Sequence, residues 1–120
     1  MHAIYFHLMR ELIMSSHFYD YYSSLPLVVQ EKFDYVMQIL IEQSVVSTKF
    51  VKRIQKSKLY EMRVSVGSNE YRTLLFAIDN ENIINASKIY LLNAFLKKST
   101  KEYKNQIKIA QNILNSSTYE

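Results

Sequence analysis

The chain has 120 residues, of which 48% are hydrophobic and 22% charged. This composition predicts one globular domain over residues 1–120 and excludes a disordered tail, a collagen-like chain or a coiled-coil rod. The net charge of +4 is unevenly divided, because residues 1–50 carry 3 Lys and Arg against 5 Asp and Glu, whereas residues 51–120 carry 12 against 6. The second half is therefore the candidate surface for phosphate groups, and a merely solvated basic face is the open alternative.

The composition also excludes several kinds of chemistry. The chain has no Cys, so disulfides, thiol nucleophiles and zinc–thiolate sites are absent. We expect His2, His7 and His17 to be structural or exposed, since they are not at metal-ligand spacing, and the single Gly67 cannot build a phosphate-binding loop. We therefore expect no metal and no cofactor. No signal peptide or membrane-length apolar run is visible, which predicts a cytoplasmic protein without a membrane partner.

The first half has the pattern of a strand followed by two helices. Residues 10–15 alternate loosely, which predicts a short strand, and Ser16 is the expected N-cap of a short helix. Pro26 suits the first turn of a second helix, because the apolar residues after it recur at helical spacing to about Gln43. Two interpretations remain open for residues 1–8: an extension of the domain or an added strand.

The second half has the pattern of a small sheet. Residues 59–66 alternate with period two and end at a turn that contains Gly67. Residues 71–79 and residues 83–96 are two further β-favouring segments. Three consecutive strands joined by short turns predict an antiparallel meander.

A polar turn and a final helix complete the predicted fold. We interpret Asp79 and Glu81, which flank the second turn, as turn-formers and not as an acid/base pair. An apolar stripe at helical spacing predicts a helix over residues 100–114. The order of elements predicts the α+β class, with N-terminal helices packed on a small antiparallel sheet and a C-terminal helix.

The candidate chemistry lies in a basic and aromatic set in the second half. Arg63 and Arg72 lie on neighbouring predicted strands and Lys97 ends the third, so these three side chains can converge on one face. Arg grips phosphate bidentately, Lys adds a compact charge, and Tyr offers a hydroxyl or a stacking ring. This combination fits RNA better than a small metabolite. The set comprises Lys52, Arg53, Lys56, Lys58, Arg63, Arg72, Lys97, Lys98, Lys101, Tyr103 and Lys104.

The two arginines of this set have a simpler interpretation as well. Acidic residues lie close to both in the sequence or on the next predicted strand. Arg63 and Arg72 would then form surface ion pairs with Glu61, Glu70 or Asp79. The pattern alone leaves both interpretations open.

Four short motifs follow one another along the second half. They are Leu59-Tyr60-Glu61-Met62-Arg63, Glu70-Tyr71-Arg72-Thr73-Leu74-Leu75-Phe76, Leu92-Asn93-Ala94-Phe95-Leu96-Lys97-Lys98-Ser99-Thr100-Lys101 and Ile107-Lys108-Ile109-Ala110. In this order and at these spacings they resemble the toxins of the RelE/ParE superfamily, most closely its HigB-like branch. The resemblance covers residues 59–114 and, by helix order alone, residues 9–50. It implies a RelE-like fold.

The resemblance also implies a function, that of the toxin in a type II toxin–antitoxin pair. Many such toxins cleave mRNA bound in the ribosomal A site without a metal: the ribose 2′-OH attacks the adjacent phosphate, and basic residues hold and neutralise it. Carried over by motif, Arg63 and Arg72 bind phosphate and neutralise the transition state. Lys97 and Lys98 bind phosphate or shuttle a proton, and Tyr103 stacks or acts in acid/base chemistry.

Other residues and partners follow from the same resemblance. The general base stays unassigned, because Glu61 stands where RelE-type members carry a catalytic Lys, although the HigB-like pattern has Glu there too. The expected partners are an antitoxin, which is a helix-turn-helix protein encoded next to the toxin, the ribosome and mRNA. The expected RNA-binding residues are Lys56, Lys58, Lys101 and Lys104.

Two other functions remain open. One is a ParE-like toxin that inhibits DNA gyrase without catalysis, and the other is an RNA-binding protein that does not cleave. The Lys97-Lys98 pair and the Arg72 motif favour the RNA-cleaving branch, although a shared fold does not decide between them.

Overall fold

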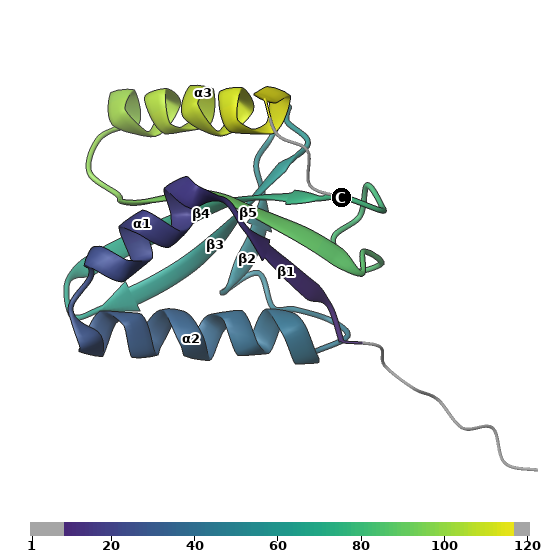
Figure 1. The fold of residues 1–120 in the computed structure, drawn as a ribbon, viewed down its shortest axis with the longest axis horizontal. Coiled ribbons are helices and arrows are strands. Elements are labelled where there is room, and N and C mark those ends of the chain that lie inside the picture. Colours follow the sequence, from purple (N-terminus) through teal and green to yellow (C-terminus); the bar gives the residue numbers. More distant parts are fainter. Residues whose placement is uncertain (1–8, 117–120) are drawn as a thin grey trace, which may run out of the picture.

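The computed structural model describes residues 9–116, in which five strands and three helices form three layers (Figure 1). In chain order these elements are β1 (Glu11–Met14), α1 (Ser16–Ser24), α2 (Leu27–Glu42), β2 (Val51–Arg53), β3 (Leu59–Val66), β4 (Asn69–Ala77), β5 (Lys88–Leu96) and α3 (Thr100–Ser116). The sheet lies between α3 on one face and α1 with α2 on the other (Figure 1). The predicted α+β class is confirmed. Residues 1–8, with His2 and His7, lie outside the described part, so both interpretations of that segment stay untested.

The sheet is larger than the predicted meander. Its strand order is β1-β5-β4-β3-β2. The pairs β3–β4 and β4–β5 are antiparallel, as expected, and β2 adds a third antiparallel pair. β1 pairs with β5 in parallel. The sequence pattern missed β2 because three residues are too few for a period-two pattern, and it missed the parallel pair because local alternation does not encode distant pairing.

The third predicted strand is wrong over residues 83–87, because β5 begins only at Lys88. The carboxylate of Asp79 accepts the backbone N–H groups of Ser87 and Lys88 at 2.9 and 3.1 Å. The side chain of Asn82 accepts the N–H of Ile84 at 3.0 Å. Such side-chain bonds to the backbone compete with a strand ladder and stabilise turns. Asp79 is therefore a turn-former, as predicted.

The helix boundaries are close to those predicted, with one correction. The N-cap of α1 is Ser15 and not Ser16: the Ser15 hydroxyl oxygen accepts the N–H of Phe18 at 3.0 Å. The same hydroxyl donates to the carbonyl of Leu92 in β5, which ties the start of α1 to the sheet. α2 begins after Pro26 and ends at Glu42, with Gln43 as its C-cap.

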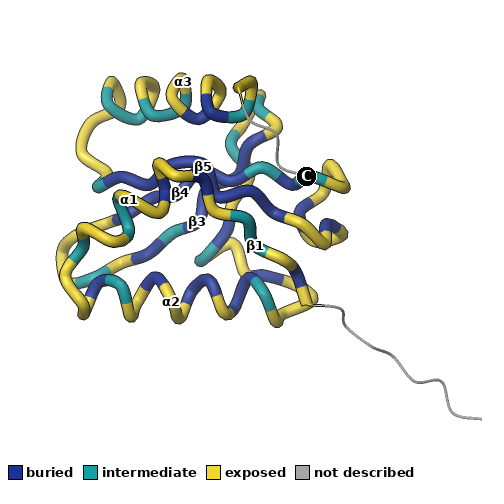
Figure 2. The backbone as a smooth tube through the Cα atoms, viewed as in Figure 1, coloured by how far each residue is buried: buried dark blue, intermediate teal, exposed yellow. Residues whose placement is uncertain are grey.

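Two separate apolar clusters hold the layers together. Buried positions are concentrated in the strands between the helices (Figure 2). The period-two pattern of β3 is confirmed: Tyr60, Met62 and Val64 pack against α1 and α2, whereas Leu59 packs toward α3. The other large members of the α1–α2 cluster include Phe18, Phe33, Leu40, Leu75 and Leu91. The α3 cluster is smaller and contains Leu59, Leu74, Tyr90, Leu92, Phe95, Ala110 and Ile113.

A bulge in β5 changes which side chains face α3. Leu74 pairs with Asn93, but the next residue of β4, Leu75, pairs with Leu91, so β5 carries one extra residue. A bulge of this kind shifts the alternation of side chains along its strand. As a result both Leu92 and Phe95 belong to the α3 cluster. Asn93 also reaches α3, where its side-chain amide donates to the carbonyl of Gln106 at 3.1 Å.

Arg10 joins the end of α2 to the loop before β5. Its side chain is buried, with 3% exposed. The guanidinium donates to the carbonyls of Leu40 at 3.0 Å, Gln43 at 2.5 Å and Ser44 at 2.9 Å. It also donates to Ile83 at 3.2 Å and Ile84 at 2.8 Å. A cation at the carboxyl end of a helix satisfies carbonyls that have no partner within the helix.

We predict that Arg10→Met destabilises the protein by about 2–4 kcal/mol. The substitution keeps much of the apolar stem but leaves several buried carbonyls without a donor. The free energy of unfolding in urea measures the effect. Lys88→Ala, an exposed lysine of β5, is the control and should change that free energy by less than about 0.5 kcal/mol. A loss no larger than that of the control would contradict the role given to Arg10.

Candidate active site

The β3–β4 register brings two arginines face to face. Arg63 of β3 is the direct partner of Arg72 of β4. Like charges in such a position repel, so a compensating anion is needed. Glu61, two residues before Arg63 on the same face of β3, supplies it. Its Oε1 lies 2.8 Å from a terminal nitrogen of Arg63, and its Oε2 lies 3.9 Å from the Nε of Arg72. One carboxylate therefore serves both guanidinium groups.

Tyr103 approaches the same carboxylate from α3. Its hydroxyl donates to Oε2 of Glu61. Its ring packs edge-on against Phe95, with 5.7 Å between ring centroids and an interplanar angle of 77°. The start of α3 is fixed by Ser99, whose hydroxyl oxygen accepts the N–H of Glu102 at 3.1 Å. The cap and the bulge that exposes Phe95 to α3 together hold Tyr103 above Glu61.

The protonation states of this pair follow from its surroundings. Burial favours the neutral form of Glu61, but the hydrogen bonds from Tyr103 and Arg63 and the charges of both arginines outweigh it and lower the pKa. Burial first, and then the hydrogen bond to Glu61 and its charge, raise the pKa of the Tyr103 phenol, and the arginines offset this only in part. At neutral pH Glu61 is ionised and Tyr103 keeps its proton.

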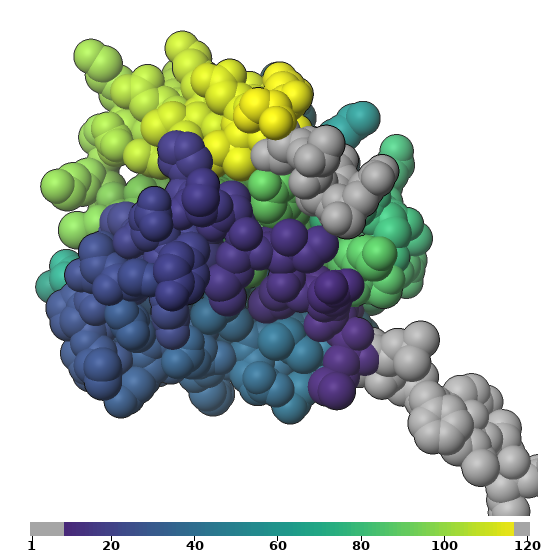
Figure 3. Space-filling view, in the orientation of Figure 1, coloured from purple at the N-terminus to yellow at the C-terminus, as the bar shows by residue number. Residues whose placement is uncertain are grey.

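A cavity of about 450 Å³ opens above this pair. We call it the α3 cavity, and its lining residues are Glu61, Lys97, Lys98, Ser99, Thr100, Tyr103, Lys104 and Ile107. The three lysines are exposed, whereas Glu61 is only 7% exposed and lies at the inner end. Side chains from the start of α3 project from the body of the protein in the space-filling view (Figure 3). The cavity therefore presents an exposed cationic rim above a buried carboxylate and a half-buried phenol.

The structure distributes the candidate residues unevenly around this cavity. Lys97, Lys98, Tyr103 and Lys104 line it, and Lys101 is exposed on the first turn of α3 outside the lining. Arg63 and Arg72 lie behind Glu61 and do not line it.

Arg72 is buried, whereas an arginine that binds phosphate directly has to be exposed to it. Its side chain is buried, since only 6% of the residue is exposed, and one terminal nitrogen donates to the carbonyl of Tyr71 at 3.0 Å. Both arginines pair with Glu61, as the alternative interpretation held, but Arg72 does so below the surface. In this conformation a phosphate in the α3 cavity meets lysines first.

Lys56 and Lys58 lie at the other end of the sheet. Lys58 precedes Leu59, which pairs with Phe76, whereas Lys97 follows Leu96, the partner of Tyr71. Phe76 and Tyr71 are five residues apart along β4, which corresponds to roughly 17 Å. The predicted RNA-binding lysines therefore do not form one patch.

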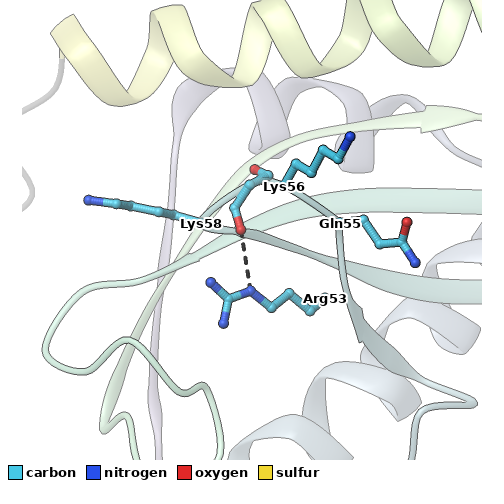
Figure 4. Close-up of a pocket in the computed structure, with 5 residues that line it drawn as sticks. Arg53, Gln55, Lys56 and Lys58 are labelled. Atoms are coloured by element: carbon cyan, nitrogen blue, oxygen red, sulfur yellow. Dashed lines mark hydrogen bonds between the residues drawn. The ribbon is translucent and has the colours of Figure 1, made fainter.

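The turn that carries Lys56 and Lys58 has a separate pocket of about 570 Å³ (Figure 4). The Nε of Arg53 donates to the carbonyl of Ser57 at 3.3 Å across this turn. Lys56 has a φ of 59°, a left-handed conformation that costs energy in a residue with a side chain. The two lysines point in different directions in Figure 4. The turn is a basic surface feature and not part of the α3 cavity.

Sequence reasoning considered Glu61 only as an ion-pair partner of the arginines and gave it no part in the chemistry, although its position carried a usable indication. Residues two apart on a strand share a face, so Glu61 and Arg63 had to be neighbours. The approach of Tyr103 to Glu61 depends on how α3 crosses the sheet, which no local pattern encodes. Within residues 9–116 no cluster of His, Asp and Glu fits a metal ion, and no helix is long and apolar enough to cross a membrane.

Comparison with known proteins gives a family and a fold. The family model described as phage derived protein Gp49-like (DUF891) matches residues 20–115, so the chain belongs to this family. A solved structure of a double arginine-to-alanine mutant of the E. coli toxin RelE, in the free state, is similar with a TM-score of 0.59 and 14% identity. The match covers 83% of this chain and 96% of that one. A search of curated proteins finds no match.

These comparisons confirm the predicted RelE-like fold. The family and the fold are consistent with the resemblance to the RelE/ParE superfamily that the four sequence motifs indicate. The HigB-like branch stays a prediction, as do the roles of the individual site residues.

We predict that Tyr103→Phe destabilises the protein by about 2 kcal/mol at pH 7, because a hydrogen bond to an ionised carboxylate is lost. Interactions that lower the pKa of Glu61 stabilise the fold above the ordinary glutamate pKa, and this stabilisation disappears as the pH falls and the carboxyl protonates. The deficit should therefore shrink at pH 3. Urea unfolding at both pH values measures it, with the exposed Tyr19→Phe as control. An equal deficit at both pH values would contradict the assignment.

Proposed function

We propose that the chain is the toxin of a type II toxin–antitoxin pair, of the HigB-like branch, and that it cleaves mRNA in the α3 cavity. The observation that carries the proposal is the ionised carboxylate of Glu61 at the inner end of a lysine-rimmed cavity, with the protonated Tyr103 beside it. The Gp49-like family and the RelE-like fold support the toxin assignment. A base, an acid and cations in one cavity are the groups that cleavage of RNA by its own 2′-OH requires.

The lysine rim is suited to hold the scissile phosphate. Lys97, Lys98 and Lys104 are exposed and line the cavity from the end of β5 and the first turns of α3. Each ammonium is a compact charge on a flexible stem, so it can follow a phosphate as negative charge grows in the transition state. Because the RNA supplies the nucleophile, the protein has only to hold the geometry and move protons.

Glu61 is the proposed general base. Its lowered pKa keeps it ionised, and it accepts the proton of the ribose 2′-OH as the 2′-oxygen attacks the adjacent phosphorus. The bond from phosphorus to the 5′-oxygen then breaks, leaving a 2′,3′-cyclic phosphate. The departing 5′-oxygen takes a proton from Tyr103 or from a rim lysine. The phenol is suited to this role only when substrate has replaced its hydrogen bond to Glu61.

The buried arginines act through Glu61 in this proposal. Arg63 and Arg72 orient the carboxylate and keep its charge in place, so they are positioning residues in the free protein. This role differs from direct phosphate binding, which their sequence motifs imply for the family. A rearrangement on the ribosome that draws Glu61 away would free both guanidinium groups for the phosphate.

The proposed partners are the ribosome, which presents the mRNA, and an antitoxin encoded beside the toxin. The site is cytoplasmic in this proposal, because its substrate is. An antitoxin that lays acidic side chains over the lysine rim would neutralise the α3 cavity, and charge complementarity of this kind favours fast and specific association.

We predict that expression of the wild-type chain without an antitoxin arrests bacterial growth and that Glu61→Gln restores it. Gln keeps the size of the side chain but cannot take a proton, and loss of a general base lowers a rate by about 10²–10⁴-fold. Mapping of new 5′ ends in cellular RNA after brief induction measures cleavage directly. Lys88→Ala, which lies outside the cavity, should stay toxic and should cleave at the same positions.

A second variant keeps this test valid if Glu61→Gln fails to fold. Lys97 is exposed, so Lys97→Ala should keep the melting temperature of the wild type and still lose most of the cleavage. Growth arrest without new RNA ends would indicate a ParE-like inhibitor of gyrase instead. Full cleavage by both variants, with their folding verified by circular dichroism, would show that the α3 cavity is not the site.

A further inference from the structure

A second cationic groove lies on the other side of Arg63. It has a volume of about 340 Å³ and lies between α2, the segment before β2, and β3. We call it the α2 groove, and its lining residues are Lys32, Tyr35, Val36, Lys49, Phe50, Arg63 and Ser65. Three of these residues are cations from three different elements, and none is a carboxylate. A groove of this kind favours an anion.

Two aromatic rings accompany the cations. Tyr35 and Phe50 pack edge to face, with 6.4 Å between ring centroids. The Nζ of Lys32 lies 5.5 Å from the ring centroid of Tyr35, and the Nζ of Lys49 lies 5.4 Å from that of Phe50. Tyr35 is 57% exposed, so its ring is accessible to a ligand in the groove. Rings interleaved with lysines are the combination that binds single-stranded nucleic acid by stacking and phosphate contact.

The groove is connected to the α3 cavity by one ion pair. Arg63 lines the α2 groove, Glu61 lines the α3 cavity, and their charged groups lie 2.8 Å apart. The two sites lie on opposite faces of the sheet, so a ligand strand that leaves the α3 cavity reaches the α2 groove around the edge of β3, where it passes Arg63 just beyond the last β2–β3 pair at Met62. The side chain of Arg63 is 31% exposed, so it is accessible from the groove side.

We propose that the α2 groove binds a flanking nucleotide of the RNA strand that is cut in the α3 cavity. The proposal rests on the proposed function, since it takes RNA as the substrate. Lys49 holds the phosphate of this nucleotide, Arg63 adds its charge while it stays paired with Glu61, and the base stacks on the exposed ring of Tyr35. Lys32 leaves the ring face as the base arrives, because stacking on a base is a stronger contact than one exposed cation–π pair. The volume of the groove is at the lower end for small-ligand sites, which fits one nucleotide.

An acidic peptide is the other ligand that three cations could attract. A carboxylate needs the lysines but not the exposed ring, and it gives no reason for the groove to adjoin the α3 cavity. The observations therefore favour RNA, and binding of an acidic peptide becomes one outcome of the test.

The test measures binding apart from cleavage. The probe is a fluorescein-labelled hexanucleotide RNA with 2′-O-methyl riboses, which lacks the nucleophile, and its anisotropy is titrated at low salt. Tyr35→Ala and Lys49→Ala should each weaken binding by about 5- to 10-fold. Tyr35→Phe, which keeps the ring, should bind like the wild type. Lys49→Ala should also reduce the slope of log K against log salt by roughly 0.7, the value for one phosphate contact on a single strand.

Matched controls separate this inference from the proposed function. Tyr19→Ala and Lys88→Ala remove an exposed ring and an exposed charge elsewhere and should not change binding. If the wild type binds and cleaves RNA but the groove variants bind equally well, the groove proposal alone is overturned. If the wild type neither binds nor cleaves, the proposed function falls with it. Binding of hexaglutamate that depends on Lys49 but not on Tyr35, without a groove effect on RNA, would assign the groove to an acidic peptide.

Discussion

The carboxylate of Glu61 is the interaction on which the arrangement of the site depends. Two arginines face each other across β3 and β4, and they can remain together under a helix only because one anion lies between them. Removing one partner from such a group of buried ion pairs leaves an uncompensated charge. This destabilises the fold more than replacing the whole group by apolar residues would. The same anion fixes the protonation states around it. Burial opposes its charge, but the hydrogen bonds from Tyr103 and Arg63 and the charges of both arginines lower its pKa, and burial together with the hydrogen bond to Glu61 raises the pKa of Tyr103.

Features away from the site serve to place Tyr103 above this carboxylate. The bulge in β5 shifts Phe95 to the face that α3 covers, and the cap at Ser99 sets where α3 begins. Phe95 then supports the ring of Tyr103 from the side. On the opposite face, Arg10 and the α1–α2 cluster hold the sheet. The sheet is thus packed on both faces, whereas the lysines that rim the cavity are exposed.

Prediction from the sequence succeeded where the local pattern and the final structure agree. β3 was predicted to the residue because its period-two alternation continues without a break from Leu59 to Val66. The helix after Pro26 was predicted for the same reason, since its apolar stripe becomes its buried face. β5 was predicted too long, because Ile83 and Ile84 look like strand residues while Asp79 and Asn82 hold this segment in turns. The parallel strand β1 needed a pairing that only tertiary structure provides.

The sequence indicated which residues gather at the site but not which of them are buried. Arg63, Arg72, Lys97 and Tyr103 were identified as a set, and the structure does bring them into one region around Glu61. The sequence could not show that Arg72 is buried, because burial depends on α3. The separation of Lys58 from Lys97 was implicit in the predicted meander, because its first and third strands run in the same direction and these lysines lie at the start of one and the end of the other.

The most direct test of the account is a measurement of the pKa of Glu61 itself. A nuclear magnetic resonance titration that follows its side-chain carboxyl carbon reports that value in the folded protein. We expect the carboxyl of Glu61 to titrate below its usual range in the wild type and to move upward in Arg63→Met, which removes the nearest cation. A carboxyl that titrates at or above its usual range in the wild type, or one that Arg63→Met leaves unchanged, would contradict the central role given to this carboxylate.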